Sequence, residues 1–244
     1  MTILQDGPAL RETVARACRV LACRGLVDGV LGHVSARVAA DQLVLRCRGQ
    51  QEQGLACTTA GDVWRFTLDG DGVDLPDGYS PPNELALHAE LMRERPAIGA
   101  VVHAHPRAAL ICGLAGLQPR GVFGAYNIPA MRLGLAGVPV FPRPVLITRR
   151  ELALDMIAAM GNADVCLLRG HGITVAGESV EQATVKAVNL HVLLEITWQL
   201  AQLGANPQDV SESDLAELPD LGSSFNDRLA WQALVAELPP RPTV

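Results

Sequence analysis

Lysine is almost absent from this 244-residue sequence: of its 20 basic residues 19 are arginine, and the only lysine is Lys186. Enzymes that cleave carbon–carbon bonds through a Schiff base need a lysine in the active site. Lys186 stands in a helix-like stretch, far in sequence from the histidine-rich segments. If the chain carries out carbon–carbon chemistry, we therefore expect a metal ion rather than an imine to accept the negative charge.

Basic clusters are missing as well. No basic run is longer than the pair Arg149 and Arg150, and the net charge is −6. Nucleic-acid-binding proteins need a basic surface for the phosphate backbone, so this class of protein is excluded. Arg11 and Glu12 precede any long apolar run, a pattern that predicts neither a signal peptide nor a transmembrane helix.

The six cysteines include no CxxC pair, which is typical neither of a zinc ribbon nor of a dense disulfide framework. Reduced thiols are the simplest interpretation of this spacing. We therefore expect a cytoplasmic protein with a small-molecule substrate and with no nucleic-acid or membrane partner.

Aromatic residues are also scarce, at 4% of the chain, although 49% of the residues are hydrophobic. The core is therefore expected to consist mainly of Leu, Val, Ala and Ile. Hydrophobic periodicity and turn residues predict an α/β fold, a mixed sheet with helices on both faces. The helices are expected at residues 8–25, 83–95, 106–114, 149–160, 179–204 and 226–238, and the strands at 34–38, 43–47, 63–68, 98–105, 165–168 and 173–176.

No stretch has the composition of a linker, so residues 1–244 are expected to form one domain, with residues 205–244 as a C-terminal helical extension. The glycine-rich residues 116–137 are expected to be irregular. Three prolines within the extended residues 138–147 indicate a position at the edge of the sheet.

Three histidines follow apolar, strand-like runs. His103 and His105 end the run IGAVVHAH, and the alternation of a strand places both imidazoles on one face. His171 follows another such run and stands between two glycines. A lone histidine is more often a structural residue, but neutral imidazoles that meet at strand ends are typical ligands of zinc and related divalent ions. The three histidines together therefore predict a metal site.

With these histidines in place, the sequence resembles the class II aldolase and adducin family. The matching segments are GHVSAR at residues 32–37, Glu84 at the start of a helix, HAHP at residues 103–106 and RGHG at residues 169–172. The resemblance covers roughly residues 8 to 205. It implies a three-layer α/β/α fold with a mixed, largely antiparallel sheet, and a homotetramer whose active sites lie between subunits.

The resemblance also implies one divalent metal ion per subunit, held by His103, His105 and His171, with Glu84 beside it as an acid or base. Zinc is the expected ion, and manganese, iron and cobalt are alternatives. Three neutral ligands leave the charge of the ion available to a substrate oxygen, where an enolate would be stabilised.

Two departures separate the chain from the family's sugar-phosphate aldolases. His33 replaces the Asn of those enzymes, and Pro82 and Asn83 replace small hydroxylic residues. These positions hold the phosphate in the sugar-phosphate members, and a phosphate needs such donors. Residues 124–143, in contrast, are similar to members that decarboxylate dihydroxylated aromatic acids. A phosphorylated sugar is therefore not the expected substrate.

The resemblance thus implies a metal-dependent carbon–carbon lyase of aromatic catabolism. A decarboxylase of a dihydroxyphthalate or dihydroxybenzoate is the principal expectation, with two adjacent substrate oxygens on the metal. Glu84 is expected to relay the proton, and Tyr126, from its own or a neighbouring subunit, is a second catalytic candidate. The expected substrate-binding residues are His33, Ser35, Arg132 and Arg169.

Alternatives stay open at this point. An aldolase acting on a non-phosphorylated hydroxy-oxo acid would use the same metal and the same Glu84, whereas an iron-dependent oxygenase on this fold would need oxygen. A non-catalytic adducin-like module would keep the fold but would not need three metal-ligating histidines. Structural roles also compete for single residues: Arg169 could hold its turn, Tyr126 could anchor its loop, and His88 is expected to be a buried helix residue.

Overall fold

A mixed sheet of seven strands runs through the centre of the computed structural model, which describes residues 7–240. The strand order is β3-β2-β1-β4-β7-β6-β5, and each neighbouring pair is antiparallel except β5 and β6. The strands are β1 (His33–Ala39), β2 (Gln42–Arg46), β3 (Val63–Thr67), β4 (Ala100–Ala104), β5 (Val140–Phe141), β6 (Val165–Leu168) and β7 (Gly172–Gly177). Residues 1–6 and 241–244 of the predicted domain lie outside the described part of the chain.

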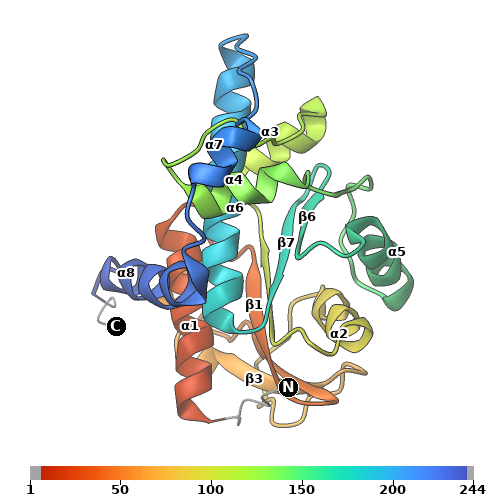
Figure 1. Ribbon diagram of the computed structural model, residues 1–244. Coiled ribbons are helices and arrows are strands. Elements are labelled where there is room, and N and C mark those ends of the chain that lie inside the picture. The colour runs from red at the N-terminus through yellow and green to blue at the C-terminus, as the bar shows by residue number, and fades with distance from the viewer. Residues whose placement is uncertain (1–6, 241–244) are drawn as a thin grey trace.

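Helices cover both faces of this sheet (Figure 1). On one face lie α1 (Pro8–Cys23), α3 (Arg107–Ala115) and α6 (Val180–Gln202), with α4 (Ile128–Leu135) against α6. On the other face lie α2 (Leu85–Glu94) and α5 (Arg150–Met160). The three-layer α/β/α architecture with a largely antiparallel sheet confirms the predicted fold class.

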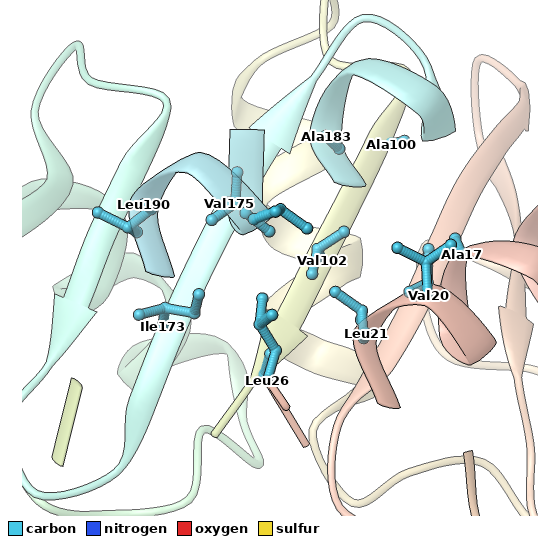
Figure 2. Close-up of a cluster of buried hydrophobic side chains, with 14 of the residues drawn as sticks. Ala17, Val20, Leu21, Leu26, Ala100, Val102, Ile173, Val175, Ala183 and Leu190 are labelled. Carbon is cyan, nitrogen blue, oxygen red and sulfur yellow. The ribbon is translucent and has the colours of Figure 1, made fainter. Parts of the chain in front are cut away.

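The alternation of the central strands assigns their side chains to two hydrophobic clusters, one on each face. Ala100 and Val102 of β4 join the cluster beneath α1 and α6, together with Val20, Ile173 and Leu190 (Figure 2). Val101, between them, joins the cluster beneath α2 and α5. His103 follows the same alternation and therefore lies on the α2 side of the sheet.

The C-terminal residues add three short helical segments after α6. These are α7 (Glu212–Glu217), a π-helical turn (Ser224–Leu229) and α8 (Ala230–Ala236). Trp231 and Leu234 of α8 pack against the first cluster, and Arg24 forms a 2.9 Å ion pair with Glu237. Two 3₁₀ turns (Leu55–Cys57 and Ala60–Asp62) lie between β2 and β3. No helix within residues 7–240 has the length and apolar character needed to span a membrane.

Several local predictions differ from the structure. Residues 116–137 are not irregular throughout, because α4 forms within them. Asn127 caps this helix by accepting a hydrogen bond from the Ala130 N–H, and proline is tolerated in a first helical turn. Helix α5 begins at Arg150, one residue later than predicted, with Arg149 as its N-cap. The predicted final helix over residues 226–238 is divided into the π-helical turn and α8, whereas the edge position of β5 is confirmed.

Candidate metal centre and active site

Four side chains that are far apart in the sequence converge on one point: Glu84, His103, His105 and His171. Their potential ligand atoms all lie within 4.8 Å of one another. Oε2 of Glu84 is 3.2 Å from Nε2 of His103 and 3.6 Å from Nε2 of His171. Nε2 of His103 is 2.7 Å from Nε2 of His105. The predicted histidine set and Glu84 therefore form one cluster.

The first two histidines are fixed by β4. His103 is its fourth residue and is fully buried. His105 follows the end of the strand, where its N–H donates to the carbonyl of Leu26, 3.0 Å away. The i and i+2 spacing turns both imidazoles to the same side, as the sequence predicts.

The third histidine is presented by the tight turn between β6 and β7. Its N–H donates to the carbonyl of Leu168 at 3.0 Å, and Gly170 has a φ of +70°, which favours glycine. A Cβ at Gly172 would collide with the carbonyl oxygen of Ala104 at the end of β4. The two glycines that flank His171 thus allow the turn to lie against the strand that carries the other ligands.

Glu84 is the N-cap residue of α2, which begins at Leu85, two residues later than predicted. Its Oε1 accepts a 2.8 Å hydrogen bond from the backbone N–H of Ile147. Its Oε2 remains directed at the histidines. One carboxylate oxygen therefore anchors the side chain, and the other faces the cluster.

The cluster favours an ionised Glu84 carboxylate and a neutral His105 imidazole. Burial by itself would raise the pKa of Glu84, but the interactions with His103, His171 and His33 outweigh it and hold this pKa far below its usual range. Burial and the nearby His103 and His171 lower the pKa of His105 to about 3. A histidine binds a metal ion only through a neutral ring nitrogen, so His105 is in the form that ligation needs.

These residues fit a divalent metal ion. Nε2 of His171 is buried and has no hydrogen-bond partner among the described residues. The close approach of the His103 and His105 Nε2 atoms directs two lone-pair sites at the same space. Three imidazole nitrogens and one carboxylate form a donor set typical of zinc, iron, cobalt or manganese.

A second group of polar side chains lies beside the cluster, between β1 and α2. Nδ1 of His33 is 2.7 Å from Nε2 of His88, and Nδ1 of His88 is 2.7 Å from the hydroxyl of Ser35. Nε2 of His33 is 3.7 Å from Oε2 of Glu84. All of these side chains are buried. Burial lowers the pKa of His33 to about 4, and the nearby Glu84 opposes this shift in part.

The positions of the protons on His33 and His88 can be assigned by starting from the carboxylate of Glu84. An ionised Glu84 only accepts, so a proton on Nε2 of His33 is favoured there. Nδ1 of His33 then accepts from His88, and Nδ1 of His88 accepts from the Ser35 hydroxyl. His88 is thus more than a buried helix residue, and it contacts His33 rather than Glu84. Its position one turn after Glu84 was the only sequence signal for it.

Three residues that the sequence predicts for the site are not members of the cluster. Tyr126 is 76% exposed and makes an edge contact with Phe123. It lines a hollow of about 570 Å³ together with His191 and Glu195, and no residue of the histidine cluster lines that hollow. Arg132 is exposed on α4, 3.5 Å from the carbonyl of Leu218. Arg169 is exposed two residues before His171.

Comparison with known proteins gives consistent matches along the chain. Residues 12–198 match the family described as Class II Aldolase and Adducin N-terminal domain. A 3,4-dihydroxyphthalate decarboxylase from Arthrobacter keyseri is 51% identical over 231 residues, which cover 93% of this chain and 93% of that protein. Another, from Terrabacter sp. (strain DBF63), is 50% identical over 233 residues, which cover 94% of this chain and 97% of that protein. An aldolase II superfamily protein from Pseudomonas syringae shares the fold, with a TM-score of 0.78, 22% identity and coverage of 96% of this chain and 94% of that one.

Proposed function

The chain belongs to the class II aldolase and adducin family, and we propose that it is a metal-dependent decarboxylase of 3,4-dihydroxyphthalate or a closely similar dihydroxylated aromatic acid. The resemblance predicted from the sequence is confirmed, including the greater similarity to the decarboxylases than to the sugar-phosphate aldolases. The predicted enzyme class, a lyase, is also confirmed. The observation that carries the proposal is the complete cluster of Glu84, His103, His105 and His171 in a chain about half identical to two such decarboxylases.

The three histidines would hold a divalent ion, with zinc as the first expectation. The ion would supply the positive charge that draws electron density away from the hydroxylated ring. Imidazole is a neutral ligand, so three histidines would not cancel the positive charge of the ion. Glu84, 3.2 Å from His103, provides the negatively charged group nearest to them.

Glu84 is suited to move a proton. Its lowered pKa leaves Glu84 ionised, so at first the carboxylate has no proton to donate and can only accept one, here from a substrate hydroxyl. The bond between the ring carbon and the carboxylate then breaks, its electron pair stays on that carbon, and carbon dioxide leaves. Glu84 returns the proton to the same carbon. The Ile147 N–H holds the other carboxylate oxygen throughout, so the transfer needs no movement of the side chain as a whole.

A homotetramer with sites between subunits is part of this proposal. Tyr126 is exposed, and the hollow that it lines contains no residue of the histidine cluster, so it would act in the site of a neighbouring subunit. Leu110 and Leu114 of α3 and Leu146 are also exposed apolar residues, which a neighbouring subunit would cover. The cytoplasmic location expected from the free cysteines remains a prediction.

The proposal is tested by purifying the protein, measuring its metal content and assaying 3,4-dihydroxyphthalate. We expect carbon dioxide and a dihydroxybenzoate in equal amounts, loss of activity on chelation, and recovery on adding back one divalent ion. Light scattering of the purified protein measures the oligomeric state in the same preparation.

Each alternative function gives a different result in these assays. Release of an aldehyde without carbon dioxide, from a hydroxy-oxo acid, would replace the decarboxylase with an aldolase. Oxygen uptake coupled to turnover would replace it with an oxygenase. A protein that binds no metal and is inactive on the whole panel of dihydroxybenzoates, dihydroxyphthalates and hydroxy-oxo acids would restore the non-catalytic module.

A further inference from the structure

Arg48 occupies a position between two parts of the active site. It follows the end of β2, which runs antiparallel to β1, so this end of β2 lies beside the start of β1 at His33. Its backbone is tied to Ser80 by two hydrogen bonds of 2.9 Å, one in each direction. Ser80 is four residues before Glu84. The backbone at Arg48 is therefore fixed beside the start of β1 at His33 and beside the segment that leads to Glu84.

The side chain of Arg48 has no hydrogen-bond or ion-pair partner in the part of the chain that the structure describes. Its Nε is buried and makes no hydrogen bond, and within residues 7–240 its guanidinium forms no ion pair. The two buried arginines of β1 and β2 have partners for their guanidinium groups: Arg37 donates to three backbone carbonyls, and Arg46 pairs with Glu52, although Nε of Arg46 makes no hydrogen bond. A partly buried guanidinium without an anion is costly, so the position is suited to an anionic ligand.

Arg48 also lies near His33. It is close enough to His33 to contribute to the low pKa of that imidazole. Arg132 and Arg169, the arginines predicted from the sequence to bind a carboxylate, are exposed on α4 and on the β6–β7 turn. Among the three, Arg48 is the one placed beside His33 with free donors.

We propose that Arg48 binds the carboxylate of the substrate that is retained in the product, an inference that rests on the proposed function. The planar guanidinium donates two parallel N–H bonds to a carboxylate, which fixes the position of the ring. The leaving carboxylate is a poor partner, because it becomes neutral carbon dioxide. A strong ion pair to it would stabilise the ground state more than the transition state and would slow the reaction.

This assignment predicts a specific kinetic pattern for Arg48→Met. An interaction that is equally strong in the ground and transition states affects KM and not kcat. We expect KM for 3,4-dihydroxyphthalate to rise roughly 10- to 100-fold, with kcat within about threefold of the wild type. Arg48→Lys keeps the positive charge but not the paired N–H donors, so its KM is expected to lie between those of the wild type and Arg48→Met. Arg16→Met removes an exposed arginine of α1 and serves as the matched control.

A binding measurement keeps the inference separate from the decarboxylase proposal. Calorimetric titration compares catechol, which lacks a carboxylate, with 2,3- and 3,4-dihydroxybenzoate, which carry one. The wild type is expected to bind at least one of the benzoates more tightly than catechol, and Arg48→Met is expected to lose that preference while keeping its circular dichroism spectrum and its catechol affinity.

The outcomes decide the two proposals independently. If the wild type shows no preference for a carboxylate, or if Arg48→Met retains it, the role of Arg48 is overturned. A fall in kcat at unchanged KM would also overturn it, since this would place Arg48 on the reacting group. If the wild type does not decarboxylate 3,4-dihydroxyphthalate, the proposed function fails, and the titration still decides whether Arg48 binds a carboxylate.

Discussion

The imidazole rings of His33 and His103 are stacked with their centroids 4.9 Å apart, because the two residues are paired across the antiparallel strands β1 and β4. His103 belongs to the cluster of potential metal ligands, and His33 begins the buried series of hydrogen bonds that continues to His88 and Ser35. The register of two strands therefore joins the candidate metal site to a hydrogen-bonded group that can face a substrate. A shift of one residue in this register would turn His33 to the opposite face.

His171→Ala is expected to lower the affinity for the metal ion by at least tenfold, because it removes one of three nitrogen ligands. The wild type is expected to contain about one ion per subunit by elemental analysis, and the variant substantially less after dialysis. His191→Ala is the matched control, since His191 lies on α6 outside the cluster. Full metal content in His171→Ala would show that this histidine is not a ligand.

Glu84→Gln is expected to reduce kcat by about 10²- to 10⁴-fold, because the amide keeps the shape of the side chain but cannot carry a proton. The amide oxygen can still accept from the Ile147 N–H, so the fold should be preserved. The kinetic assay is read together with metal content, which separates loss of proton transfer from loss of the ion. Glu94→Gln, at an exposed position of the same helix, provides the comparison. An active, metal-loaded Glu84→Gln protein would contradict the proton-transfer role.

Ser35→Ala is expected to destabilise the protein by about 1–3 kcal/mol, because it leaves Nδ1 of the buried His88 without its hydrogen-bond partner. Urea unfolding measures the free energy of unfolding, with Ser223→Ala, at an exposed position, as the control. The nitrogen NMR signals of the imidazoles of His88 and His33 should shift as well, because the hydroxyl selects the tautomer. Unchanged signals would mean that Ser35 does not orient this chain.

Much of the site was predictable because its signals are local. The spacing of His103 and His105 on a strand, and the glycines around His171, specify directions that depend on a few residues of backbone. The alternation in β1 likewise predicts a strand, with Val34 and Ala36 on one side and Ser35 and Arg37 on the other. It does not show that the polar side is buried, which occurs because α2 covers it.

The residues that sequence reasoning missed depend on packing between distant elements. His88 contacts His33 only because α2 crosses β1 at one particular position, and Arg48 approaches the site through the pairing of β2 with β1 and the bridge to Ser80. Helix α4 was missed for a different reason. In the sequence, Gly134 indicates the end of a helix. In the structure, a Cβ at this position would collide with the backbone of Arg120, so the glycine permits a close contact within α4.

The carboxylate of Asp74 gives a prediction for the pH dependence of stability. It is 2.6 Å from Nη2 of Arg11, accepts a 2.8 Å bond from the Arg65 N–H, and so links α1 to β3. Burial raises its pKa, but these partners outweigh burial and lower it below the usual value. A carboxyl group with a lowered pKa in the folded state stabilises the protein above its unfolded pKa, and this stabilisation is lost as the pH falls through the folded pKa.

Asp74→Asn is therefore expected to lower the free energy of unfolding by roughly 1 kcal/mol at neutral pH, since the ion pair is partly exposed to solvent. The difference between wild type and variant should be constant above about pH 5 and should shrink as the carboxyl group is protonated at lower pH. Urea unfolding at a series of pH values measures it, with Asp77→Asn, an exposed carboxylate in the same loop, as the control. A difference that stays the same down to the acid limit of folding would show that the charge of Asp74 does not contribute, because only the ionised form attracts Arg11.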